Sequence, residues 1–92
     1  MNIEQIFNSF NDECNRQDEK WGVRNQHPAV WLSILTEEIG EVAKEINDGG
    51  FDTAKIDLEK YRAELIQCGA VITQMLKNTK DYEIRIENNT RD

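Results

Sequence analysis

The chain has 92 residues and a formal net charge of −7, with 38% hydrophobic and 32% charged side chains. This balance is typical of one small soluble globular domain, and the negative charge argues against nucleic acid or an anionic membrane surface as a partner. No apolar run approaches the roughly 18 residues that span a bilayer, and the N-terminus does not resemble a signal peptide, so we expect a cytoplasmic protein that does not bind membranes.

One proline and few β-branched runs predict an all-α fold with three main helices. The first helix is expected over about residues 2–20, where apolar side chains recur at steps of three and four: Ile3, Ile6, Phe7, Phe10 and Cys14. Gly22 interrupts this pattern. The second helix is expected to begin at Pro28, whose missing N–H has no partner in a first helical turn, and to end near Asp48, before a Gly-Gly pair.

The third helix is expected to take Asp52 or Thr53 as its N-cap and to run to about Asn78. Its apolar side chains are Leu58, Tyr61, Leu65, Cys68, Ile72, Met75 and Leu76. The following segment alternates polar and apolar residues and could form a short strand, a docked tail or a frayed end. We therefore expect one helical domain over residues 1–79 and a C-terminal tail over 80–92 that could be flexible.

The small size of the chain limits its core. A domain of this length buries only about 60–65% of the surface of its unfolded chain, so association with copies of itself is a reasonable expectation. Cys14 and Cys68 match no zinc or redox spacing and are expected to be reduced packing residues.

Glutamates lie at the edge of the apolar stripe on both later helices. At about 100° per residue, Glu38 lies at the boundary of the stripe on the second helix, with Glu41 one turn further on. Glu64 and Gln67 occupy the same two places on the third helix. If the two stripes face each other, these four side chains converge. Alternatively, each glutamate belongs to a solvated face, as is common on amphipathic helices.

Converging carboxylates repel one another by about 1–4 kcal/mol per pair at ~4 Å, depending on the effective dielectric constant. Either their pKa values rise or a cation neutralises them. A ligand set made only of oxygen suits Mg²⁺, Mn²⁺ or Ca²⁺, and the lack of His and Cys beside it argues against zinc.

The two motifs resemble those of the MazG-like all-α nucleoside triphosphate pyrophosphohydrolases, a family recognised by E-x-x-E on one helix and E-x-x-D on a following one. Here "EEIGE" supplies Glu38 and Glu41, and "AELIQ" supplies Glu64 and Gln67. The approach "EKWGVRNQHPAVWLSIL" is also similar to the family, with a tryptophan-containing loop and a proline ahead of the first motif. The resemblance covers about residues 12–77.

The resemblance implies Mg²⁺-dependent hydrolysis of an NTP or dNTP between the α- and β-phosphates, which gives a nucleoside monophosphate and pyrophosphate and clears the nucleotide pool. Glu38, Glu41 and Glu64 carry over as metal ligands of the catalytic site, with Mn²⁺ as a possible substitute for Mg²⁺. Gln67 stands where the family has Asp; its amide oxygen could ligate a hard cation, but the site loses one negative charge. The family also implies a homodimer or homotetramer, in which the second and third helices contribute to a four-helix bundle completed by oligomerisation.

The expected substrate contacts lie around the loop between the first two helices. Trp21 occupies the place where the family has an aromatic residue that stacks on a base, although it could equally close the end of the bundle. His27 could bond a base or phosphate, and Lys20 or Arg24 could pair with phosphate; an ordinary surface role is the alternative for each. Trp31 falls inside the apolar stripe and is expected in the core.

The alternative to an enzyme is a catalytically inactive helical interaction or nucleotide-binding module on the same scaffold, with Gln67 marking the loss of activity. A regulator that binds divalent cations or nucleotides without turnover is a third possibility.

Overall fold

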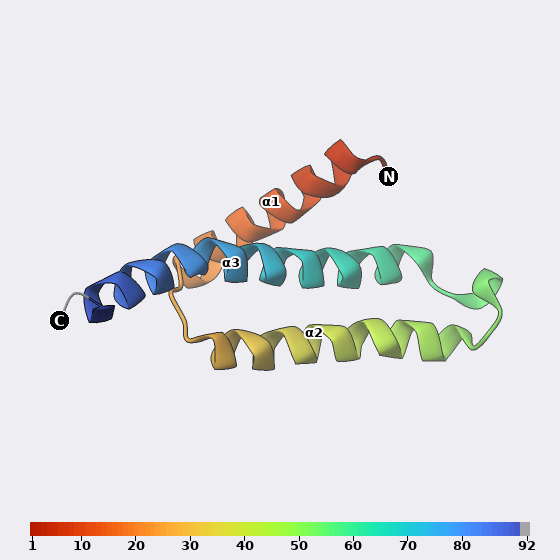
Figure 1. Ribbon diagram of the computed structural model, residues 1–92. Coiled ribbons are helices and arrows are strands. Elements are labelled where there is room, and N and C mark those ends of the chain that lie inside the picture. The colour runs from red at the N-terminus through yellow and green to blue at the C-terminus, as the bar shows by residue number, and fades with distance from the viewer. Residues whose placement is uncertain (91–92) are drawn as a thin grey trace.

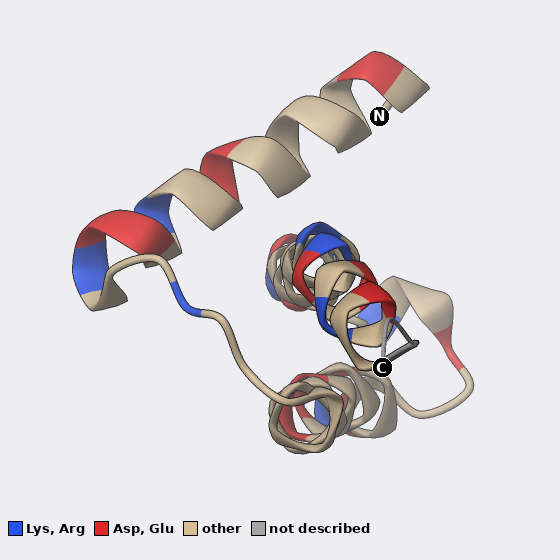
Figure 2. Cartoon of the chain, turned by 60° about the vertical axis from the view of Figure 1, so that its left-hand side comes forward, with Lys and Arg blue, Asp and Glu red and all other residues tan. Residues whose placement is uncertain are grey.

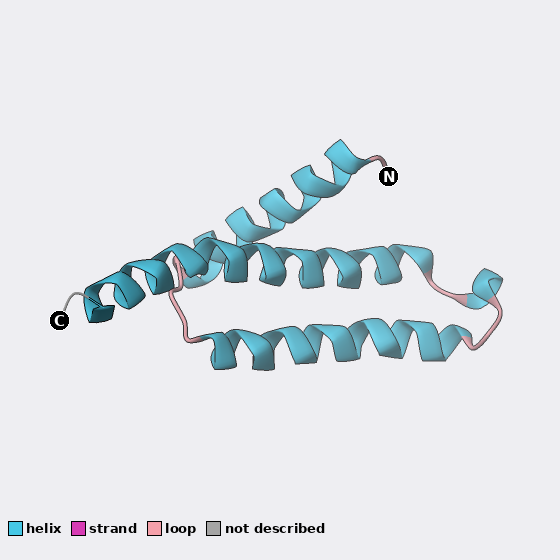
Figure 3. Ribbon diagram, viewed as in Figure 1, coloured by secondary structure: helices cyan, strands magenta, loops and turns pink. Residues whose placement is uncertain are grey.

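The computed structural model describes residues 1–90 and contains three long α-helices joined by short connections (Figure 1). Helix α1 spans Ile3–Trp21, α2 spans Pro28–Gly49 and α3 spans Leu58–Thr90, and a short 3-10 helix, η1, spans Thr53–Lys55. The described part of the chain contains no strand (Figure 3). The predicted all-α fold with three main helices is therefore confirmed.

Helix α3 is the central element of the fold. Helix α2 runs antiparallel to it, while α1 packs on another side of α3 and diverges from it toward the N-terminus (Figure 1, Figure 2). The molecule is elongated as a result, with extents of 59 × 24 × 24 Å. Because both other helices pack against α3, a group of side chains shared by all three must be centred on it.

Short-range hydrogen bonds fix the ends of α1 and α2 close to the expected positions. At the start of α1, Asn2 Oδ1 accepts from the Gln5 N–H and Gln5 Oε1 accepts from the Asn2 N–H, each at 2.9 Å. This reciprocal pair is a capping box. His27 caps α2, its Nδ1 accepting from the Ala29 N–H at 3.0 Å. Helix α2 stops at Gly50, whose φ of 63° favours glycine.

The start of α3 differs from the expectation. Asp52 does act as a cap, but for η1: its Oδ1 accepts from the Ala54 N–H at 3.0 Å. Helix α3 begins after Asp57, whose Oδ1 accepts a backbone N–H three residues on at 3.1 Å. Ile56 lies between η1 and α3 and packs on Gly49. The contact is so tight that a Cβ at position 49 would lie 2.5 Å from Ile56 Cγ1. This contact turns the chain before α3 starts.

The end of α3 also differs. The helix continues to Thr90 instead of ending near Asn78, so a strand over residues 82–86 is wrong. No Gly or Pro occurs within this extension, and the sequence therefore gives the helix no reason to break. The Tyr82 hydroxyl also donates to the Gln26 carbonyl and ties the extension to the loop before α2. The last two residues of the expected tail lie outside the part of the chain that the structure describes.

Asn78 on α3 holds the loop between α1 and α2. Its side chain is buried, and Oδ1 accepts from Trp31 Nε1 at 2.6 Å and from the Gln26 N–H at 3.1 Å. Its Nδ2 donates to the Arg24 carbonyl at 3.3 Å and to Asn25 Oδ1 at 3.2 Å. Four polar contacts from one buried side chain therefore position the loop in which the substrate contacts were expected.

The hydrophobic core is small. Among the described residues, the buried apolar side chains are Cys14, Trp31, Ala70 and Val71. Trp31 is 1% exposed, which confirms its expected place in the core. The Cys14 thiol donates to the Ala70 carbonyl at 3.4 Å, and both cysteines are free. Many other large apolar side chains stay partly exposed in the single chain.

Candidate metal and nucleotide site

Carboxylates of α2 and α3 approach one another where these helices pack. Burial raises the pKa of Glu38 above its ordinary value of 4.5, and the charges of Glu64, Glu41, Glu37 and Glu13 raise it further. Glu64 on the opposite helix contributes more than Glu41 on the same helix. Glu38 and Glu64 therefore lie within electrostatic range across the interface, with Glu41 beside them.

The same carboxylates also affect Cys68, which lies one turn after Glu64 on α3. Its pKa is raised first by burial and then by the charges of Glu38 and Glu64. Negative charge thus gathers at the α2–α3 interface, at the boundary of the apolar stripe.

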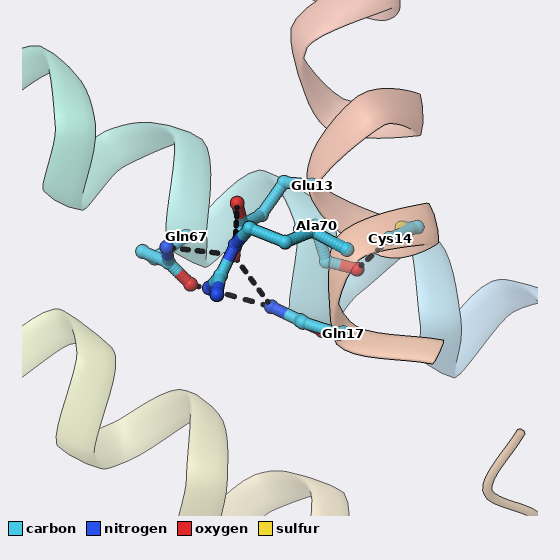
Figure 4. Close-up of polar contacts among 6 residues, drawn as sticks. Glu13, Cys14, Gln17, Gln67 and Ala70 are labelled. Carbon is cyan, nitrogen blue, oxygen red and sulfur yellow. Dashed lines mark hydrogen bonds and ion pairs between the residues drawn. The ribbon is translucent and has the colours of Figure 1, made fainter. Parts of the chain in front are cut away.

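Gln67 is directed toward α1 (Figure 4). Its Nε2 donates to Glu13 Oε1 at 2.7 Å, and its Oε1 accepts from Gln17 Nε2 at 3.3 Å. Both ends of the amide are thus engaged by α1. The charge of Glu13 makes the smallest of the contributions that raise the pKa of Glu38, so Glu13 lies within electrostatic range of α2.

The sequence interpretation did not include Glu13 and Gln17 among the site residues. One signal for them was present: Gln17 lies three residues after Cys14, on the continuation of the apolar stripe of α1. A glutamine in that place is expected to be buried and to need polar partners. Gln17 is 7% exposed, and Glu13 lies one turn before it on the same helix face.

Arg16 neutralises Glu13 from the solvent side. Its Nε lies 2.9 Å from Glu13 Oε2 and its Nη2 lies 2.5 Å from Oε1. The hydrogen bond from Arg16 is the largest influence on Glu13 and lowers the pKa of its carboxyl. Burial acts in the opposite direction, and the hydrogen bonds from Gln67 and Gln17 add to the lowering. Glu13 is therefore ionised at neutral pH.

The donor chemistry of these residues fits a hard divalent cation. Carboxylates of three helices and the amide oxygens of Gln17 and Gln67 make a set of oxygen donors, which suits Mg²⁺ or Mn²⁺. Gln17 Oε1 is buried and has no hydrogen-bond partner, although the same amide contacts Glu13 and Gln67. Within residues 1–90, no three His, Cys, Asp or Glu side chains are already grouped closely enough to hold an ion. Binding of a cation would therefore require these side chains to change rotamer and move closer to one another.

Lys20 and Trp21 lie together at the end of α1. Trp21 is 61% exposed, and Lys20 Nζ lies 4.8 Å from the centroid of its ring. Trp21 follows Gln17 by four residues, about 6 Å along the helix axis. An exposed aromatic ring with an adjacent cation is therefore held one turn from the polar cluster.

The other two candidate contacts have structural partners. His27 Nδ1 is the N-cap acceptor of α2, so this nitrogen orders a helix end. The Arg24 guanidinium lies 5.2 Å from the centroid of the Trp31 ring and packs over it.

No protein-family model, curated protein or solved structure matches this chain. The function is therefore inferred from the residues of the site. Within residues 1–90, no helix combines the length and the apolar character that a membrane span requires.

The raised pKa of Glu38 predicts how a neutral side chain at this position affects stability. Ionisation of Glu38 costs more in the folded chain than in the unfolded chain, so the cost is absent below pH ~4.5 and fully present above the raised pKa. Without divalent cations, Glu38→Gln should raise the melting temperature at pH 7–8, and the gain should disappear toward pH 4.

Thermal melts across this pH range at fixed protein concentration measure the effect. Glu37→Gln is the control, because Glu37 is exposed and neighbours Glu38; it should cause a smaller change. A stabilisation by Glu38→Gln that persists undiminished at pH 4 would contradict the electrostatic explanation.

Proposed function

We propose that this protein is a Mg²⁺-dependent nucleoside triphosphate pyrophosphohydrolase of the MazG-like type. It would hydrolyse an NTP or dNTP between the α- and β-phosphates and release a nucleoside monophosphate and pyrophosphate. The observation that carries the proposal is that Glu38 on α2 and Glu64 on α3 lie within electrostatic range of each other across the interface, with Glu41 one turn from Glu38. These are the residues of the paired motifs.

In this proposal Glu38, Glu41 and Glu64 hold the cation, and Gln67 contributes through its amide oxygen. Bound Mg²⁺ would supply Lewis-acid polarisation of the phosphate oxygens and a charge that offsets the repulsion between substrate and protein. The carboxylates fix the position of the triphosphate relative to an attacking water. Such positioning, together with electrostatic stabilisation, supplies most of the rate enhancement in phosphoryl-type transfers.

The exposed ring of Trp21 offers a stacking surface for the base, and Lys20 offers a cation for a phosphate oxygen. Lys20 Nζ lies 4.8 Å from the centroid of the Trp21 ring, and this proximity supports a role of both side chains toward one substrate. His27 would contribute by ordering the start of α2 through its Nδ1. Its other ring nitrogen, Nε2, would contact the substrate.

A second copy of the chain would complete a four-helix bundle, as a homodimer or a homotetramer. Two rows of apolar side chains recur at steps of seven, and together we call them "the apolar face". The row on α2 is Leu32, Ile39 and Ile46, and the row on α3 is Leu58, Leu65 and Ile72. Each of them is between 39% and 59% exposed. The rows lie about 80–120° around the helix axes from Glu38 and Glu64, in the same sense. In an antiparallel pair this places both rows on one face.

The surface area of the chain agrees with a missing partner. Its accessible surface is 7005 Å², whereas a folded monomer of this mass exposes about 5,500 Å². Its radius of gyration is 16.3 Å, against about 12 Å for a compact domain of this length. The excess of roughly 1,500 Å² is comparable to what one subunit buries in an obligate dimer.

The apolar face leaves the polar cluster accessible. Gln67, Ala70 and Gln74 contact α1 and lie about 60–120° from Glu64 in the sense opposite to the apolar rows. The half of α1 that carries Glu13 is therefore on the other side of the α2–α3 pair. A second copy could cover the apolar face without occluding the carboxylates.

One observation favours the alternative of an inactive interaction or nucleotide-binding module. Both ends of the Gln67 amide are engaged by α1, so its oxygen is directed to Gln17 and not to Glu38 or Glu64. If this arrangement persists with substrate, position 67 gives no ligand to a cation.

Pyrophosphate release from a panel of NTPs and dNTPs with Mg²⁺ tests the enzyme. We expect turnover of at least one nucleotide and a loss of about 10²-fold or more in Glu38→Gln, because a removed metal ligand weakens both cation binding and positioning. Glu37→Gln is the matched control and should retain activity, since Glu37 is exposed on the same helix. Release from no nucleotide, or equal turnover in Glu38→Gln, would reject the enzyme and favour the module.

The mass of the particle in solution tests the second copy. Light scattering during size-exclusion chromatography should give a multiple of 10.7 kDa for the wild type. Ile39→Lys and Leu65→Lys should shift the mass toward the monomer, because each buries a charge in the apolar face. Val23→Lys is the control, since Val23 is 80% exposed in a loop. A wild-type protein that stays monomeric at all concentrations would exclude the four-helix bundle.

A further inference from the structure

We propose that Glu13 on α1 supplies the carboxylate ligand that position 67 lacks, so that the cation site takes its fourth acidic residue from a third helix. This inference rests on the proposed function, since it concerns the same site. It assigns to α1 a direct part in cation binding, which the paired motifs on α2 and α3 do not contain.

The Glu13 side chain lies against Gln67. Its carboxylate accepts from Gln67 Nε2 at 2.7 Å and from Gln17 Nε2 at 3.4 Å, and the side chain is 12% exposed (Figure 4). An aspartate at position 67 would bring its charge to the place that the Gln67 amide now occupies. Glu13 brings the same charge to within one hydrogen bond of that place.

The amide of Gln17 provides a further oxygen beside Glu13. Gln17 is 7% exposed, and its Oε1 is buried with no hydrogen-bond partner, while its Nε2 contacts both Glu13 and Gln67. A buried amide oxygen without a donor is unfavourable, and native structures rarely retain one without a reason. Amide oxygens are good ligands for hard cations. A cation bound beside Glu13 would satisfy this oxygen.

Arg16 explains how Glu13 remains near the site without a cation. The guanidinium neutralises the carboxylate, and the Arg16 side chain is 55% exposed. Because Arg16 lies on the solvent side of the pair, water can replace its contact with the less exposed carboxylate of Glu13. Arg16 can therefore withdraw into solvent when a divalent cation takes its place beside Glu13.

Close packing of α1 on α3 keeps Glu13 within reach. Cys14, the next residue, is fully buried and its thiol donates to the Ala70 carbonyl at 3.4 Å. One turn earlier, the Phe10 ring covers Gly69 so closely that a Cβ at position 69 would overlap it. The pair of small residues at 69 and 70 thus lets α1 approach α3, and this close packing brings Glu13 to Gln67.

Calorimetric titration with Mg²⁺ in the absence of nucleotide tests this role directly. We compare the wild type with Glu13→Gln, Gln67→Asp and the double variant, each checked for unchanged helix content by circular dichroism. Glu13→Gln should weaken Mg²⁺ binding about tenfold or more, because one charged ligand is lost while the shape is kept. The double variant should return most of that affinity, since Gln67→Asp restores a carboxylate at the site. Glu19→Gln is the control and should bind as the wild type does, because Glu19 is exposed on the same helix.

The outcomes separate this inference from the proposed function. Equal Mg²⁺ binding by Glu13→Gln and the wild type would overturn the role of Glu13 and leave the carboxylates of α2 and α3 as the whole site. Weak binding by the double variant would show that Glu13 acts on the shape of the site and not as a replaceable charge, which also overturns it. A wild type that does not bind Mg²⁺ would overturn both proposals.

Discussion

Repulsion among carboxylates that are partly buried between α2 and α3 is the constraint on which the site depends. The apolar stripes of the two helices pack against each other, and this packing partly buries Glu38 within electrostatic range of Glu64. The raised pKa of Glu38 is the direct result, since burial and like charges both disfavour its ionised form. In the proposed function, a bound cation would relieve this repulsion, and the relief would favour its binding.

Helix α1 supplies the polar surroundings of this place. Glu13 and Gln17 reach α3 because small residues at 69 and 70 let the helices approach closely. Gln67 is the point of contact, with both ends of its amide bonded to α1. The amide at position 67 is thus accompanied by a carboxylate on a neighbouring helix. In the proposed cation site, these two residues act as one arrangement.

Local signals in the sequence predicted most of the fold. Pro28 and the Gly-Gly pair mark the ends of α2, and the apolar spacing that begins at Ile3 marks the extent of α1, because each of these signals lies within or next to its helix. The extension of α3 to Thr90 was missed, since alternation over a few residues is compatible with both a strand and a helix. The start of α3 at Leu58 depended on the contact of Ile56 with α2, which is not local.

The candidate site was predictable only in part, for the same reason. Helical spacing alone placed Glu38 and Glu64 at matching boundaries of two stripes, and the electrostatics of the fold agree with their approach. The direction of the Gln67 amide and the contribution of Glu13 depend on how α1 crosses α3. No spacing within one helix encodes that crossing, although the buried position of Gln17 pointed to a polar partner.

The central claim is that the carboxylates between α2 and α3 form a cation site, and the thermal stability of the wild type in a series of Mg²⁺ concentrations tests it most directly. A cation that binds only the folded chain adds about 2.7 kcal/mol to the free energy of unfolding at 100 times its dissociation constant. The melting temperature should therefore rise with Mg²⁺ beyond the change produced by NaCl at equal ionic strength, which accounts for screening. A melting temperature that follows ionic strength alone would contradict the claim.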